Sequence, residues 1–186
     1  MIEIKNRYTN DPINSVKEDP STKGLLFAGS ETAVYVSFDD GENWQSLKLN
    51  MPATSIRDLV IKDDDIVVGT HGRSFWILDN ITPLRQLVNK AKLQGPIFYE
   101  PQTAMRIRWN NYTDSPVPQE EPAGQNPPDG AIFDYYLSEN AREVVTLQIK
   151  DENNNVIRSF RSDDKPYEIP AVNIPLYSFD SENCYS

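Results

Sequence analysis

The sequence contains only one cysteine and one histidine. Cys184 has no second cysteine to pair with, so an internal disulfide bond is excluded. A metal site built from cysteine and histidine is excluded as well, because such sites combine several of these side chains. A Ser-His-Asp triad would have to use His71, and no nucleophile-elbow sequence accompanies this residue. We therefore expect no metal ion and no cofactor.

Excess positive charge and long apolar runs are also missing. The formal net charge is −10, and an acidic surface repels the phosphates of nucleic acids and of anionic membranes. No apolar run approaches the length that crosses a bilayer. The first residues, Met1 to Lys5, lack the basic and apolar regions of a signal peptide. We therefore expect neither a nucleic-acid partner nor insertion into a membrane.

Short apolar runs separated by turn residues fill the first half of the chain, which is typical of β-strands. One set of expected strands covers residues 13–16, 24–29, 33–37 and 44–49, and a second covers 56–61, 66–70 and 74–78. Segments 26–30 and 33–37 align with 66–70 and 74–78 at an offset of about 40 residues, the length of a four-stranded propeller blade. The sequence thus predicts about two four-stranded blades that must cover one another.

A helix is expected over residues 82–90. Thr82 is the candidate N-cap and Pro83 takes the first helical position. Leu84, Leu87 and Val88 recur at the spacing of one helical face, so this face is expected to dock on the sheet.

The second half of the chain changes character. Residues 113–129 are polar and rich in proline, which predicts a loop. Strands are expected at residues 104–109, 132–137, 144–149 and 156–160, with a hairpin turn at 151–155, and this pattern is typical of an immunoglobulin-like sandwich. We expect a mostly β fold with propeller blades in residues 1–81, a linker helix in 82–95 and the sandwich in 96–186. The tail from about residue 161 is polar and is expected to be poorly ordered.

Residues 37–44 fit the pattern Ser-x-Asp-x-Gly-x-x-Trp, the Asp box. Gly41 supplies the positive φ of a tight hairpin, and Asp39 can accept hydrogen bonds from turn amides. Trp44 offers a large ring that can be buried between blades. Ser37, Asp39, Gly41 and Trp44 are therefore expected to be structural; surface contacts or metal binding are the alternative.

On this motif and on residues 23–29, 34–47 and 69–79, the chain resembles the Asp-box (BNR) repeat proteins, which include sialidases, xyloglucanases and sortilin-type propellers. It is most similar to bacterial proteins labelled glycosyl hydrolase or sortilin-like. The resemblance implies the last blades of a propeller, then a helix and an immunoglobulin-like sandwich, in a secreted or periplasmic protein. Closed propellers have about 4–8 blades, so this chain is expected to be a fragment. The second blade has no Asp box, and neither the sialidase arginines nor a xyloglucanase catalytic aspartate can be assigned, so catalytic residues stay unknown.

The connection between residues 70 and 74 is the best ligand candidate in the sequence. His71, Arg73 and the nearby Trp76 are suited to a sugar or a carboxylate, and a guanidinium can form a forked pair with an anion. The alternative, which we favour, is that Arg73 pairs with a neighbouring blade and His71 caps a turn. The acidic run at residues 63–65 lacks the spacing of a calcium loop and is expected to be a solvated turn.

Two functions follow from these observations. The first is a non-catalytic binding or scaffold fragment of a secreted propeller protein, with a glycan or a protein as ligand. The second is part of a glycoside hydrolase whose acidic residues come mostly from blades absent here; the adjacent Glu120 and Glu121 cannot flank a scissile bond. Exposed sheet edges and faces also predict self-association, or pairing with the missing blades.

Overall fold

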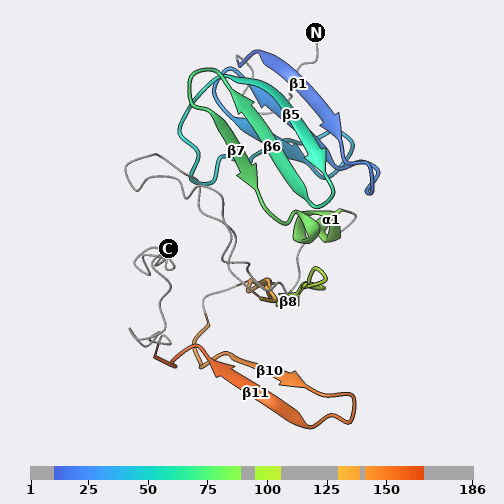
Figure 1. The fold of residues 1–186 in the computed structure, drawn as a ribbon, viewed down its shortest axis with the longest axis vertical. Helices are drawn as coiled ribbons and strands as arrows, with labels where there is room; N and C mark the ends of the chain where they lie inside the picture. Colours follow the sequence, from blue (N-terminus) through green and yellow to red (C-terminus); the bar gives the residue numbers. More distant parts are fainter. Residues whose placement is uncertain (1–10, 89–94, 106–129, 139–140, 166–186) are drawn as a thin grey trace, which may run out of the picture. The chain divides into compact units, whose positions relative to one another are not determined.

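The computed structural model describes residues 11–88, 95–105, 130–138 and 141–165, and Figure 1 shows their elements. The chain divides into two compact units, residues 1–138 and 139–186, and each is described by itself. The prediction of a mostly β fold with one short helix is confirmed, because the described residues form several antiparallel sheets and a single helix. These residues form no closed barrel.

The first sheet has four strands in chain order, β1 (Ile13–Glu18), β2 (Leu26–Ser30), β3 (Val34–Ser37) and β4 (Gln45–Ser46). Its central strands are buried almost throughout. The second sheet has three, β5 (Ile56–Lys62), β6 (Asp65–Thr70) and β7 (Phe75–Leu78), where four were expected. Within the described residues, β7 is therefore the last strand of its sheet.

Corresponding strands of the two sheets pair in the same register. Val16 pairs with Ala28 in the first sheet, as Leu59 pairs with Val68 in the second. Both pairings are interrupted at the same place, between Ile13 and Ser15 in one sheet and between Ile56 and Asp58 in the other. The next strands continue the match, since Ala28 pairs with Tyr35 and Val68 pairs with Trp76. Each position in β1–β3 thus has a counterpart in β5–β7.

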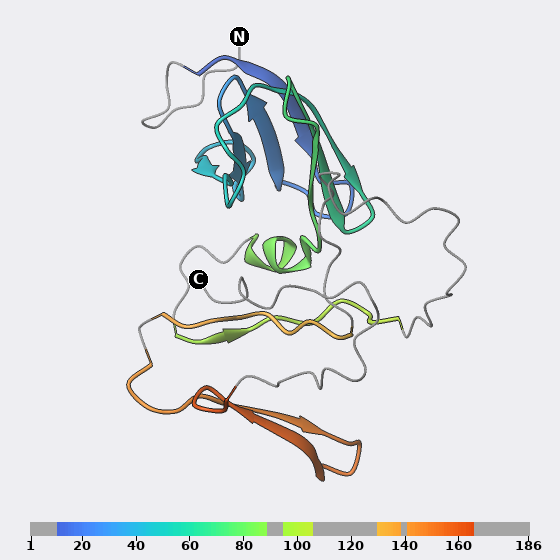
Figure 2. The same ribbon diagram turned by 60° about the vertical axis from the view of Figure 1, so that its left-hand side comes forward.

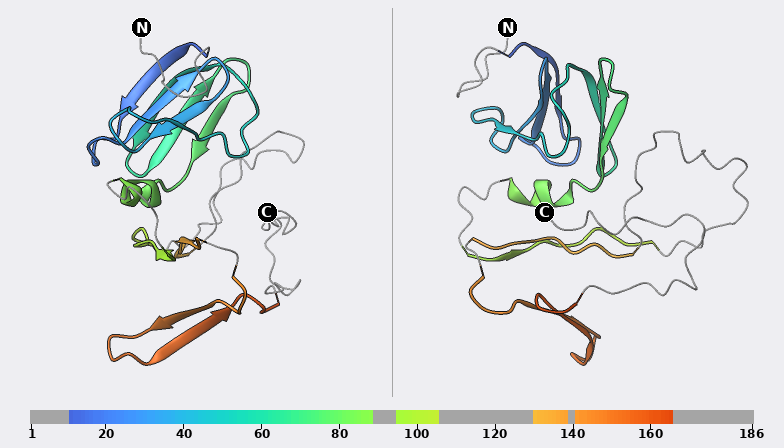
Figure 3. Two further views of the ribbon diagram at one scale, coloured as in Figure 1. Left: turned by 180° about the vertical axis from the view of Figure 1, so that it is seen from behind. Right: turned by 90° about the vertical axis from the view of Figure 1, so that its left-hand side faces the viewer.

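The sheets lie face to face, as the right-hand view in Figure 3 shows, and the main core fills the space between them. Both sheets contribute buried side chains to it, including Phe27, Val34 and Val36 from the first and Leu59 and Val68 from the second. The counterparts of Phe27, Val34 and Val36 are Val67, Phe75 and Ile77, and these belong to the opposite, more exposed side of the second sheet. The sheets therefore stack in the same sense, front to back.

Helix α1 (Thr82–Leu87) follows β7 and lies below the two sheets in Figure 2. It is shorter than the predicted 82–90, because Val88 already has an extended ψ of 136°. Thr82 is not the N-cap; Ile81 holds that position without a side-chain cap. The hydroxyl of Thr82 donates instead to Asn80 Oδ1 at 2.6 Å. The predicted apolar face is present in part, since Leu84 and Val88 pack against the core.

The rest of the described chain forms two small sheets. In the first unit β8 (Ile97–Phe98) pairs with β9 (Tyr135–Tyr136), so the strand expected at 132–137 is much shorter. In the second unit β10 (Thr146–Lys150) pairs with β11 (Val156–Arg161) around the turn expected at 151–155. Ala104 and Met105 are not in a strand. The immunoglobulin-like sandwich stays a prediction; residues 106–129, 139–140 and 166–186, including the proline-rich loop and most of the expected tail, lie outside the described residues.

Candidate functional site

The β6–β7 connection, which carries His71 and Arg73, is held by its own backbone. The Thr70 hydroxyl donates to the Ser74 carbonyl at 2.6 Å and accepts from the Arg73 N–H at 3.1 Å. Gly72 has a φ of 82°, which suits the tight turn. The His71 N–H donates to the Ser55 carbonyl at 2.8 Å. Both the imidazole and the guanidinium are thereby left exposed, and within the described part of the chain Arg73 makes no ion pair.

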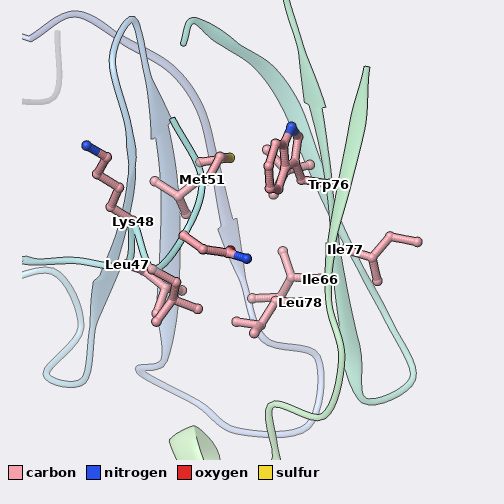
Figure 4. Close-up of a pocket in the computed structure, with 11 residues that line it drawn as sticks. Leu47, Lys48, Met51, Ile66, Trp76, Ile77 and Leu78 are labelled. Carbon is pink, nitrogen blue, oxygen red and sulfur yellow. The ribbon is translucent and has the colours of Figure 1, made fainter. Parts of the chain in front are cut away.

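Trp76 does not join these two side chains on the surface. Its indole Nε1 donates to the backbone carbonyl of Arg73 at 3.0 Å, while the half-buried ring packs against the main core. Figure 4 shows the ring in the space between the two sheets, with Ile77 directed the other way. The structure brings Trp76 and Arg73 together only through this backbone bond, so the indole is not an open platform for a sugar ring.

The indole lines a cavity of about 60 Å³ between β7 and the segment that follows β4. Its walls are mostly apolar, and they comprise Val34, Leu47, Lys48, Leu49, Asn50, Met51, Ile66, Val68, Trp76, Ile77 and Leu78. Leu49 is 66% exposed and has a φ of 47°. The sequence does not predict this cavity, because the only local signal is the apolar residues of 47–51, part of which also fit a longer fourth strand.

The Asp box forms the connection between β3 and β4. Asp39 Oδ1 accepts the Asn43 N–H at 2.8 Å and the Ser37 hydroxyl at 2.9 Å, and the Gly41 N–H donates to Ser37 Oγ at 2.9 Å. Gly41 has a φ of 90°. Partial burial opposes ionisation of Asp39, but the hydrogen bonds from Asn43 and Ser37 outweigh it and hold the pKa of this carboxyl below its ordinary value. The carboxylate is thus committed to the turn itself.

Trp44, expected to be buried between blades, lies on the face of the first sheet that is turned away from the second. It is buried there, and its neighbours are Ala28, Ala33 and Tyr35. The ring therefore does not lie between the two described sheets. Successive side chains of a strand point to opposite faces of the sheet. Val36 and Phe27 fill the main core, so their neighbours Tyr35 and Ala28, which contact Trp44, lie on the other face.

The acidic turn at residues 63–65 is not simply solvated. Arg85 of α1 forms an ion pair with Asp64 and another with Asp19, whose oxygen lies 2.9 Å from Nη2. Arg85 also donates to the Asp63 carbonyl at 2.7 Å. Burial opposes the charge of Arg85, yet the hydrogen bonds that it donates to the carboxylates of Asp19 and Asp64 raise its pKa. One guanidinium thus ties the helix to both sheets, and no spacing rule in the sequence pointed to this pairing.

Comparison of the chain with protein-family models, with curated proteins and with solved structures gave no match. In the described ranges no three His, Cys, Asp or Glu side chains gather in a way that would hold a metal ion. The same ranges contain no helix with the length and apolarity needed to cross a membrane.

Proposed function

We propose that the chain is a non-catalytic binding or scaffold module, part of a secreted propeller-type protein of the kind that its Asp box resembles. One observation carries the proposal. The outer face of the second sheet is formed by Val60, Val67, Phe75 and Ile77, and the last three are the counterparts of Phe27, Val34 and Val36, which the first sheet buries. On this outer face Val60, Phe75 and Ile77 are 51%, 74% and 58% exposed.

The counterparts in the first sheet support this reading. Val34 and Val36 are each only 3% exposed, because the second sheet covers them. Burying one such side chain stabilises a complex by about 1.5–3 kcal/mol, so an uncovered face of this composition favours contact with another surface. Sheets that stack front to back leave the last face open for another sheet. The occupant is a further blade or, when the chain is alone, a second copy.

Gel filtration with light scattering tests the proposal on the intact chain. We expect self-association that grows with concentration and that is lost in the double variant Val60→Ser, Phe75→Ser. The control is Leu49→Ser, which removes an equally exposed leucine that is not on the outer face. A compact monomer at about 100 µM, where weak interfaces of micromolar affinity are populated, would contradict the proposal, as would association that both variants retain.

The alternative, a portion of a glycoside hydrolase, has less support. Asp19 and Asp64 are bound to Arg85, and Asp39 is bound within its turn, so these carboxylates are occupied in structural roles. Release of a fluorophore from aryl glycosides by the purified chain would favour the hydrolase. Loss of glycan binding on His71→Ala or Arg73→Ala would instead place a sugar site at the β6–β7 connection.

A further inference from the structure

We infer that the outer edge of β7 binds an extended segment of a partner polypeptide, which adds a fourth strand to β5–β7 and inserts an apolar side chain into the cavity beside Trp76. This inference rests on the proposed function as a binding module. The partner contributes a strand with apolar side chains at alternate positions.

The first sheet shows how such a strand pairs. There β4 extends the sheet beyond β3, with Tyr35 opposite Ser46 and Val36 opposite Gln45. The Leu47 N–H continues the ladder by donating to the Val34 carbonyl at 2.8 Å. The counterparts of Val34, Tyr35 and Val36 are Phe75, Trp76 and Ile77. In the part of the chain that the structure describes, no strand pairs with this edge of β7.

The backbone of β7 presents hydrogen-bonding groups on that edge. The Ser74 carbonyl accepts from Thr70, so it is directed toward β6. Backbone groups alternate sides along an antiparallel strand, so Trp76 and Leu78 share this direction. Phe75 and Ile77 then direct their N–H and C=O groups to the open edge, as Val34 does toward Leu47. An open edge of this kind is a template for strand addition.

The cavity supplies the specificity. Along β7 the side chains alternate, with Trp76 and Leu78 half-buried on the core side and Phe75 and Ile77 exposed. The side chains of an added strand alternate in the same way, so the residue beside Trp76 or Leu78 lies over the cavity. The cavity is small and bounded by Leu47, Met51 and Ile66, which suits a branched aliphatic side chain. The net charge of −10 favours basic residues at the solvent-facing ends of the partner segment.

A synthetic peptide tests the inference. The probe is fluorescein-labelled Lys-Thr-Val-Thr-Val-Thr-Lys, and its control has the same composition with the two valines adjacent. We expect the alternating peptide to raise the fluorescence anisotropy at concentrations about tenfold lower than the control peptide does, because only alternation aligns both valines with the cavity side. Equal binding of the two peptides overturns the inference.

Variants of the chain locate the binding. Ile77→Pro removes an edge N–H without touching the bonds to β6, and Leu47→Phe fills the cavity from its opposite wall. Each is expected to weaken the alternating peptide about tenfold, while Val60→Ser, away from the edge, binds as the unaltered chain does. Circular dichroism checks that the variants are folded. If Ile77→Pro fails to fold, Leu47→Phe decides, and unchanged binding by a folded edge or cavity variant overturns the inference.

Light scattering on the same variants separates this inference from the proposed function. If the chain associates through Phe75 but the peptide does not bind, the strand site is wrong and the scaffold function stands. If the peptide binds but the chain does not associate through its outer face, the strand site stands and the scaffold function is wrong. If association is lost in Ile77→Pro and kept in the double variant Val60→Ser, Phe75→Ser, the edge is occupied by a second copy of the chain and not by a separate partner.

Discussion

The γ2 methyl group of Ile56 occupies the space where a side chain on Gly29 would begin: a Cβ at position 29 would lie only 2.5 Å from it. The two sheets are therefore in close contact where the second sheet's first strand meets this glycine. At the counterpart, Gly69, a Cβ would meet only ordinary contacts, 3.6 Å from the ring of Phe75 and 3.6 Å from the Asp58 carbonyl. One glycine is required by packing between sheets, and its counterpart is not.

The substitution Gly29→Ala is expected to destabilise the chain by about 1–3 kcal/mol, because the added methyl must push Ile56 away from a packed core. Gly69→Ala is expected to be neutral or to stabilise by up to about 1 kcal/mol, since alanine restricts the unfolded chain more than glycine does. Urea unfolding of the two variants measures both changes. Equal losses of stability at the two positions would show that the sheets do not meet at Gly29.

The variant Arg85→Met is expected to lower the free energy of unfolding by about 3 kcal/mol, because it leaves the Asp19 carboxylate, which is 0% exposed, without its cation. The amide groups of Ser21 and Thr22 still donate to this carboxylate, at 2.9 and 2.7 Å, which limits the loss. Thermal and urea unfolding followed by tryptophan fluorescence measures the change.

The matched control is Lys62→Met, which removes an ion pair with Asp63 in the same unit. Both side chains of that pair are largely exposed, so little or no change in stability is expected. If Arg85→Met were no more costly than Lys62→Met, then the buried ion pair would not fix the helix to the sheets.

The Asp box makes the stability of the chain depend on pH, and the direction of the change follows from Asp39. The folded pKa of Asp39 is below its ordinary value of 3.8, so its carboxylate contributes stability above that pH and loses the contribution as the pH falls through the folded pKa. Asp39→Asn is therefore expected to be less stable than the unaltered chain at neutral pH and to approach it in acid. Unfolding curves measured from pH 7 downward report this difference; a difference that stays constant with pH would show that the charge of Asp39 does not stabilise the turn.

Local patterns in the sequence predicted local structure well. Alternating apolar residues placed the strands that the structure has as β1, β3 and β7 to within a few residues, and Pro83 marked the start of α1. The strand ends that were predicted wrongly depend on the neighbouring strand in the sheet. The strand expected at 132–137 is reduced to Tyr135–Tyr136, where it pairs with β8, since a strand extends only as far as its partner does.

The order of strands and turns follows from the sequence alone, because hydrophobic alternation and turn residues act over a few neighbouring positions. The sequence also placed the Asp box on a hairpin, since Ser37, Asp39 and Gly41 bind one another within a short segment. The packing of the sheets sets three further features: Trp76 lies between the two sheets whereas Trp44 does not, Arg85 reaches Asp19 across 66 positions of sequence, and no described strand pairs with the outer edge of β7. These features depend on which faces of the two sheets pack together. That packing joins segments that are far apart in the chain, so short sequence patterns do not predict it.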